Sequence, residues 1–255
     1  MAKDHSVRPH ALRRGGYVAR FAQSPADSDA AAALRHLCFV EAAGRPALKG
    51  GLETDQFDSL CDHVLVEDAA GKIVCCFRVL PFGSGAEIHT SYSAQYYDLE
   101  CLSAYGDPLV ELGRFCVHPD VQDADVLRIA WGMLAAIVDA RGAGMLFGCA
   151  SFEGTDPTPY GQALDLLAAR HLTPFDWMPR IKSPDVVPFA RTATPVEDHR
   201  AALAQVPSLL KTYLTMGGWV SDHAVIDAQM NTLHVFTGLE ISAIPAARAK
   251  ALRTI

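Results

Sequence analysis

Residues 123–142 carry the clearest helical pattern in the chain, and this pattern constrains the fold more than any other feature. Apolar residues recur at i, i+3, i+4 and i+7 across DADVLRIAWGMLAAIVDARG. Asp123 is placed to cap the start of this helix, and Gly142 stands just past its end. An apolar run precedes the helix in PLVELGRFCVHP and another follows it in GMLFGCASF. Buried strands on both sides of a helix predict an α/β fold with a mixed sheet.

Further predicted elements extend this alternation in both directions. SPADSDAAAALRHLCFVEA predicts a helix over 24–42, and HVLVEDAAGKIVCCFRVLPF predicts two strands joined by a tight turn at Ala70 and Gly71. PYGQALDLLAARH and PSLLKTYLTMGG predict helices, whereas WVSDHAVIDA and LHVFTGL predict closing strands. Residues 44–62 have three glycines among scattered polar residues and are predicted to form a long loop. Long loops inside compact domains often carry function.

Length and composition limit the classes of protein to which the chain can belong. Its 255 residues fit one large domain, and we expect a flexible N-terminal arm over 1–16, a single domain over 17–240 and a C-terminal tail over 241–255. The net charge of −7 argues against nucleic acid as the main partner. The seven cysteines form no CxxC pair, and their odd number does not suggest a disulfide framework.

The same features predict where the protein resides. Cysteines in apolar runs are typical of a reducing cytoplasm. MAKDHSVRPHALRRGG lacks the apolar region of a signal peptide, and IAWGMLAAIV is too short to span a bilayer. We therefore expect a cytoplasmic protein, with peripheral contact at the inner face of the cytoplasmic membrane left open. No group of histidine, cysteine and aspartate residues has metal-ligand spacing, so no metal site is predicted.

Two charges interrupt the apolar strand PLVELGRFCVHP, at Glu111 and Arg114. Burying an ionised group is costly unless it is paired. Residues three apart in a strand point to opposite faces, so these two do not pair directly unless a bulge at Gly113 redirects one of them.

Arg78 lies in the middle of the apolar strand CFRVLP, and Asp55 and Asp58 lie in the long loop. Together with Glu111 or Arg114 they are predicted to form a buried charged network. Such a network is either purely structural, fixing the loop, or it recognises the ammonium and carboxylate groups of a small zwitterion. Both interpretations stay open at this point.

The order of these charged motifs resembles a known family. R-x-x-x-F at Arg35 (RHLCF), D-x-F-D (DQFD), C-x-R-V-L-P (CFRVLP) and E-x-x-R-F-x-V (ELGRFCV) resemble the acyl-homoserine-lactone synthases. The segments ELGRFCVHPD, LFGCASFEGTDP, PSLLKTYLTMGGWVSDHAVID and NTLHVF resemble more closely the ornithine N-α-acyltransferases of bacterial ornithine-lipid synthesis. The resemblance covers about residues 17 to 238, nearly the whole chain.

This resemblance implies a Gcn5-related N-acyltransferase-like fold, with a splayed central sheet and helices on both faces, so that residues 17–240 form a single acyltransferase domain. It implies transfer of a 3-hydroxyacyl chain from acyl carrier protein to the α-amine of L-ornithine, which gives lyso-ornithine lipid. The acyl carrier protein thioester is the expected co-substrate and partner, and no bound cofactor or metal is implied.

The chemistry then suggests roles for the charged residues. Glu111, with Arg114 beside it, is the first candidate for the catalytic group that accepts the proton of the amine. The backbone N–H groups of Cys116 and Val117 are candidates for stabilising the oxyanion. Asp55 or Asp58 is expected to hold the side-chain ammonium of ornithine, and Arg78 or Arg114 its carboxylate. Arg35, from the first motif, is grouped with these substrate-binding residues.

One segment departs from the acetyl-CoA-dependent enzymes of this fold. Those enzymes carry a glycine-rich turn whose N–H groups cradle the CoA pyrophosphate at a helix N-terminus. Here the corresponding segment is VHPDVQDADVLRI, which has no glycine and three aspartates. This favours a carrier-protein donor, and the basic residues around Arg13–Arg14 and Arg180–Lys182 are candidates for docking it.

Other interpretations remain. One is an acyl-homoserine-lactone synthase that uses S-adenosylmethionine, and another is a non-catalytic acyl- or carrier-binding protein on the same fold. Covalent catalysis by Cys116 is a third, and it would require a lowered thiol pKa and a partner base. Acyl chain length and oligomeric state are not predicted.

Overall fold

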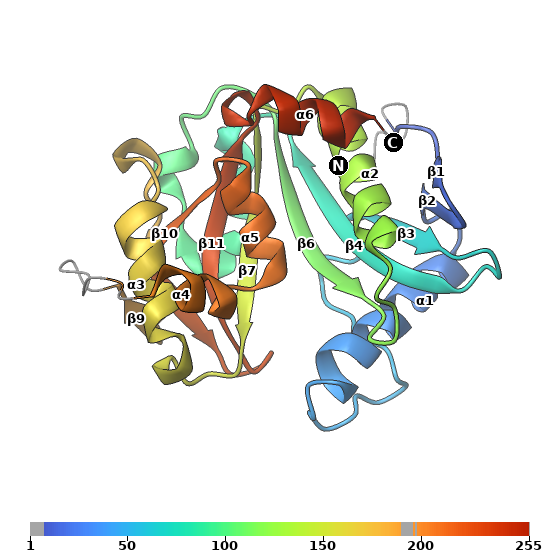
Figure 1. Cartoon of the computed structure of the whole chain (residues 1–255), viewed down its shortest axis with the longest axis horizontal. Helices are drawn as coiled ribbons and strands as arrows, with labels where there is room; N and C mark the ends of the chain where they lie inside the picture. Colours follow the sequence, from blue (N-terminus) through green and yellow to red (C-terminus); the bar gives the residue numbers. More distant parts are fainter. Residues whose placement is uncertain (1–7, 190–195, 197, 255) are drawn as a thin grey trace. The chain divides into compact units, whose positions relative to one another are not determined.

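Residues 8–189, 196 and 198–254 are described in a computed structural model of the chain (Figure 1). The chain divides into two compact units. Unit 1 comprises Met1–Pro81, Leu112–Ala143 and Ala246–Ile255, and unit 2 comprises Phe82–Glu111 and Gly144–Pro245. This division was not predicted, and the prediction of one acyltransferase domain over 17–240 stays a prediction.

Unit 1 is built from antiparallel strands with a helix packed on each face. Its elements are β1 (Leu12–Arg14), β2 (Tyr17–Phe21), α1 (Pro25–His36), the π-helix η2 (Leu37–Glu41), β3 (Asp62–Glu67), β4 (Ile73–Phe82), β6 (Leu109–Val117), α2 (Ala124–Arg141) and α6 (Ala246–Arg253). The register pairs β1 with β2, β2 with β3 and β3 with β4. Strand β6 begins in the last residues of unit 2 and continues into unit 1.

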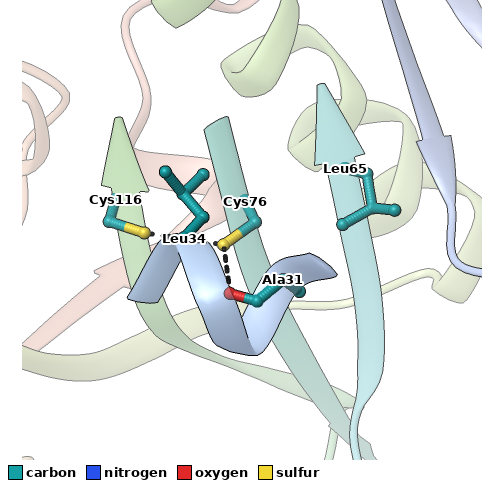
Figure 2. Packing of buried hydrophobic residues seen from close by; sticks show 5 residues of the cluster. All are labelled: Ala31, Leu34, Leu65, Cys76 and Cys116. Carbon is teal, nitrogen blue, oxygen red and sulfur yellow. Dashed lines mark hydrogen bonds between the residues drawn. The ribbon is translucent and has the colours of Figure 1, made fainter. Parts of the chain in front are cut away.

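Side chains along β4 and β6 point alternately to the two faces of the sheet in unit 1, and each face carries a layer of apolar residues. Cys76 and Cys116 pack against Ala31 and Leu34 of α1, together with Leu65 of β3 (Figure 2). The residues next to these cysteines, Phe77 and Phe115, point the other way, and Phe115 contacts Trp131 of α2. Because successive strand residues face opposite sides, α1 and α2 cover opposite faces of this sheet.

Local signals fix both of these helices at the predicted residues. Ser24 caps α1 by accepting a hydrogen bond from the Asp27 N–H, and Asp123 caps α2 by accepting one from the Asp125 N–H. Gly142 follows α2 with φ of 59°, the left-handed conformation that glycine adopts at low cost. The predicted helices over 24–42 and 123–142 are confirmed, and so are the strands of the 63–82 hairpin.

In unit 2 the strands β7, β11, β10 and β9 pair antiparallel in that order, and the short strands β5 and β8 form a separate antiparallel pair. Its elements are η3 (Gly85–Thr90), η4 (Ser93–Gln95), β5 (Tyr97–Asp98), η5 (Glu100–Leu102), β7 (Met145–Glu153), η6 (Thr158–Tyr160), α3 (Gly161–Arg170), η7 (Phe175–Trp177), β8 (Arg180–Ile181), β9 (Val186–Pro188), α4 (His199–Gln205), α5 (Ser208–Thr215), β10 (Trp219–Asp227), β11 (Thr232–Glu240) and η8 (Ile241–Ala243). Helix α5 packs against β11.

An aromatic layer covers one face of the unit 2 sheet. Phe236 of β11 stacks with Phe147 of β7 and with Trp219 of β10. Tyr97 from β5 contacts the same Phe236 ring and donates a hydrogen bond to the His234 carbonyl at 2.8 Å. Tyr97 therefore lies over the face of β11 that carries the Phe236 ring.

Parts of the predicted arm and tail are structured. Residues 12–14 form β1, because Gly15 with φ of 56° turns the chain back so that β1 pairs with β2. Residues 246–253 form α6, and Arg253 makes a two-pronged ion pair with Asp139 of α2 at 2.6 and 2.7 Å. Residues 1–7 and 255, the remaining ends of the arm and the tail, lie outside the described residues.

The observed elements form an α/β fold with helices on both faces of its sheet in unit 1, so the predicted fold class is confirmed. Across the described ranges, no helix combines the length and the apolar character needed to cross a membrane.

Candidate active site

Six charged side chains meet in unit 1, where α1, β4, β6 and the loop before β3 converge. Arg35 of α1 is buried, with 2% of its surface exposed. It donates to both carboxylate oxygens of Asp58, from Nη1 at 2.7 Å and Nη2 at 2.9 Å. Its Nε donates to the Glu53 carbonyl at 3.2 Å. One arginine therefore ties the loop to α1 at two points.

Arg78 of β4 makes the same kind of two-pronged contact with Asp55. Nη1 and Nη2 each lie 2.6 Å from one Asp55 oxygen, and Nη1 also donates to Asp58 at 2.9 Å. Two-pronged arginine–carboxylate pairs are the strongest and most directional of the charged hydrogen bonds. The predicted network of Asp55, Asp58 and Arg78 thus exists.

Arg114 of β6 joins the network on the side that Glu53 occupies. Its Nε donates to Glu53 at 3.0 Å and its Nη2 donates to Asp55 at 3.0 Å. Glu53 also lies 2.8 Å from the Arg35 Nε, an ion pair rather than a hydrogen bond because that N–H is directed to the Glu53 carbonyl. Three arginines and three carboxylates balance the buried charge, which is the condition for tolerating it.

Glu53 is a member of the network that sequence reasoning missed. It is buried, with 4% of its surface exposed. It stands two residues before Asp55 in the same polar loop, and this spacing is the one sequence signal that could have identified it. Glutamates are almost never fully buried unless they are paired.

The strand itself is irregular at Arg114. Its φ is +52°, a left-handed conformation that costs an L-residue with a side chain about 1–2 kcal/mol. This irregular residue directly follows Gly113, the position where the sequence left a bulge open. Local strain of this kind persists only where surrounding contacts hold it, and here Glu53 and Asp55 hold the guanidinium.

The arginines set the ionisation of the two aspartates. Burial alone would raise the pKa of Asp58, but hydrogen bonds from Arg35 and the charges of Arg35 and Arg78 hold that pKa well below its usual range. For Asp55, burial is likewise outweighed by Arg78 and Arg114, and its pKa is lowered. Both groups are therefore carboxylates at neutral pH.

This ionisation predicts how stability depends on pH. The unfolded Asp58 takes up its proton near pH 3.9, about the value for an unperturbed aspartate, and the folded one only at lower pH. Between these values the unfolded state binds more protons, so the free energy of unfolding falls as the pH falls. We expect urea unfolding between pH 7 and 2 to show this decline. Asp58→Asn should lower stability at pH 7 and flatten the decline.

Asp120→Asn is the matched control for this titration, because the Asp120 side chain is 90% exposed. It should leave both the stability at pH 7 and the slope below pH 4 as in the unmodified protein. A slope in Asp58→Asn as steep as in the unmodified protein would contradict the assignment of the decline to this network.

Glu111 lies in unit 2, where it forms a second group of polar contacts. Its carboxylate accepts the Tyr92 N–H at 2.8 Å on Oε2, and the Ser93 N–H at 2.7 Å and Ser93 hydroxyl at 2.6 Å on Oε1. Glu111 is 4% exposed and Ser93 is fully buried. Tyr213 of α5 lies close enough that burial first, and the negative charge of Glu111 second, raise the pKa of its hydroxyl. The site thus holds a buried, strongly hydrogen-bonded carboxylate.

Cys116 is placed as a small buried hydrophobe. Its sulfur lies 3.5 Å from that of Cys76 in the layer beneath α1 (Figure 2). Hydrogen bonds with Cys38 and Cys76, together with burial, raise the pKa of the Cys116 thiol. Since a nucleophilic cysteine needs the thiolate, this arrangement disfavours covalent catalysis. The backbone N–H groups of Cys116 and Val117 remain predicted oxyanion donors.

The structure groups the predicted residues by unit. Arg35, Asp55, Asp58, Arg78 and Arg114 are joined by direct ion pairs, all within unit 1. The contacts described for Glu111 lie with residues 92 and 93 of unit 2. In the described part of the chain, no three histidine, cysteine, aspartate or glutamate side chains are grouped so as to hold a metal ion.

Comparison with known proteins identifies similar sequences along almost the whole chain. Residues 34–132 match the model of an acetyltransferase (GNAT) domain. The chain is 36% identical over 241 residues to an L-ornithine N(alpha)-acyltransferase of Rhodobacter capsulatus, an alignment that covers 89% of this chain and 91% of that protein. It is 32% identical to an L-ornithine N(alpha)-acyltransferase of Brucella abortus, which covers 91% of this chain and 87% of the other.

A solved structure shows the same fold at low sequence identity. FeeM, an N-acyl amino acid synthase from uncultured soil microbes, aligns with a TM-score of 0.50 and 9% identity, over 89% of this chain and 92% of that chain. At this identity the similarity concerns the fold alone.

Proposed function

Because the chain belongs to the family of L-ornithine N(alpha)-acyltransferases, we propose that it transfers a 3-hydroxyacyl chain from acyl carrier protein to the α-amine of L-ornithine. The observation that carries this proposal is the 36% identity across nine-tenths of both chains. The product would be a lyso-ornithine lipid. The thioester itself supplies the activation, so the reaction as proposed draws on no bound cofactor.

The proposed reaction forms an amide and breaks a thioester. The amine nitrogen attacks the carbonyl carbon, the carbon–sulfur bond breaks, and the carrier leaves as a thiol that takes up the proton lost by the amine. A group that accepts this proton during the attack accelerates the step by about 10²–10⁴-fold. Glu111 is the proposed acceptor, directly or through water, because its buried carboxylate is fixed in one orientation.

The start of α2 supports a carrier-protein donor over a CoA donor. A helix N-terminus binds phosphate through its free N–H groups. Here the Asp123 carboxylate already accepts the Asp125 N–H, and Asp125 in turn pairs with Arg14 and Arg128. The Asp123 carboxylate thus occupies one of these N–H groups and adds a negative charge at the helix start, which disfavours a pyrophosphate there.

The charged network bears on how the acceptor substrate, ornithine, would bind. Arg35, Asp55, Asp58 and Arg78 already pair with one another, which fixes residues 53–58 to α1 and β4. Binding ornithine through them would exchange one of these ion pairs for the ammonium or carboxylate of the substrate. Their direct contact with ornithine stays a prediction, and so does contact of the protein with a membrane surface.

Mass spectrometry of the product tests the proposed function. Purified protein would be mixed with 3-hydroxyacyl carrier protein, or with the matching acyl-CoA, and with ornithine, lysine, glutamine, glycine or S-adenosylmethionine in separate reactions. We expect Nα-acylornithine from the carrier protein, at a rate at least ~10-fold above that with acyl-CoA. Fragment ions distinguish acylation of the α-amine from acylation of the side chain.

Each other outcome has a definite meaning. An equal rate with acyl-CoA would reject the carrier-protein donor while keeping the acyl transfer. An acyl-homoserine lactone from S-adenosylmethionine, or no product from any pair, would reject the proposed function.

A further inference from the structure

A short buried turn of unit 2 holds Glu111 through three hydrogen bonds. The Tyr92 N–H binds one carboxylate oxygen, and the N–H and the hydroxyl of Ser93 bind the other, all at 2.6–2.8 Å. Ser91 closes the turn from within, since its hydroxyl oxygen accepts the Ala94 N–H at 3.1 Å. Ser91 and Ser93 are both buried, at 2% and 0% exposure.

These donors act on the carboxylate in two ways. With at least one donor on each oxygen, they fix the plane and the rotamer of the side chain. They also bind the ionised form better than the protonated form, because a protonated carboxyl has one oxygen that no longer accepts well. Hydrogen bonds to a charged group are worth roughly twice those between neutral groups.

Among the described residues, a phenol and a thiol also lie near this site. The Tyr213 hydroxyl comes from α5 and interacts with the charge of Glu111, and the Cys149 thiol of β7 donates to the Ser93 oxygen at 3.5 Å. In this contact Ser93 is the acceptor, so its own hydroxyl proton stays available for the hydrogen bond to Glu111. The hydroxyl of Ser93 is thus the side-chain donor that the described contacts place on this carboxylate.

We propose that Ser93 is a positioning residue for amide formation, whose hydroxyl keeps Glu111 ionised and correctly oriented to accept the proton of the amine. The catalytic part of this inference rests on the proposed function. The hydrogen bonds and their effect on ionisation do not, so the two can be tested apart.

The first test follows the Glu111 carboxyl directly. The protein would be labelled with ¹³C at the glutamate side-chain carboxyl carbon and titrated by NMR, with Glu111→Gln used to assign the signal. In Ser93→Ala the Glu111 signal should titrate at a pH higher by about 1 unit, the size expected for one lost hydrogen bond to a charged group. Ser93→Thr retains the hydroxyl and should titrate as the unmodified protein does.

Ser91→Ala is the matched control, because it removes an equally buried hydroxyl from the same turn without touching Glu111. It should leave the Glu111 titration unchanged. A Ser93→Ala titration that coincides with that of the unmodified protein would overturn the proposal. If the alanine variant does not fold, Ser93→Cys, with its weaker donor, must shift the titration in the same direction, and no shift there would overturn it equally.

The second test is the pH profile of kcat/KM for amide formation. In Ser93→Ala the acidic limb of this profile should move to higher pH, and kcat should fall by about 10-fold. In Ser93→Thr the position of the limb and the value of kcat should be those of the unmodified protein. A serine that only stabilises the fold would lower the melting temperature without moving the limb. If the unmodified protein forms no amide, the proposed function fails, while the NMR titration still decides whether Ser93 controls Glu111.

Discussion

Arg78→Ala is expected to lower the free energy of unfolding by about 3–5 kcal/mol, the cost of removing one partner from a buried ion pair. Arg78 is 2% exposed and binds both oxygens of Asp55 and one of Asp58. Its loss leaves two carboxylates only partly compensated, and it also removes the guanidinium that lies over the Phe57 ring at 5.8 Å. Urea unfolding at pH 7 measures this change.

Arg128→Ala provides the matched control. Arg128 also pairs with an aspartate, Asp125 at 2.8 Å, but its side chain is 60% exposed. Exposed pairs contribute about 0–1 kcal/mol, so this variant should remain close to the unmodified protein. If Arg78→Ala lowers the free energy of unfolding no more than Arg128→Ala does, the network contributes little to stability. A role of the network in substrate binding would then be favoured.

Glu111→Gln is expected to reduce turnover by at least ~100-fold, the lower end for loss of a general base. Glutamine keeps the size and shape of the side chain and one carbonyl oxygen for the Ser93 donors. Its amide group cannot accept the Tyr92 N–H, and it cannot take up a proton at neutral pH. The amide-forming assay, run beside a melting curve, separates loss of chemistry from loss of fold.

The alanine variant is less informative than the glutamine variant. Glu111→Ala would leave the Tyr92 and Ser93 N–H groups buried without their acceptor, and each such group costs about 1–3 kcal/mol. Full activity in Glu111→Gln would remove Glu111 from the mechanism. It would leave the carboxylate as an anchor for the turn at residues 91–95.

Much of the fold was predictable because its signals are local. The boundaries of α2 follow from a capping aspartate, a helical apolar period and a glycine, all within twenty consecutive residues. The hairpin of β3 and β4 follows from two apolar runs and a short polar turn. By contrast, β1 and α6 were missed, because neither has a strong pattern of its own. β1 depends on its pairing with β2, and α6 on its contact with α2.

The sequence by itself determined the α/β class, the family and the charged residues that do not belong in an apolar strand. Only the tertiary structure decided their partners. Arg114 meets Glu53 across 61 residues of sequence, and Glu111 meets Ser93 across 18. A buried charge can be recognised in a sequence because it interrupts a run of apolar residues. The apolar neighbours along the strand indicate that the strand is buried. The group that compensates the charge is set by how distant segments pack, and no local pattern encodes that choice.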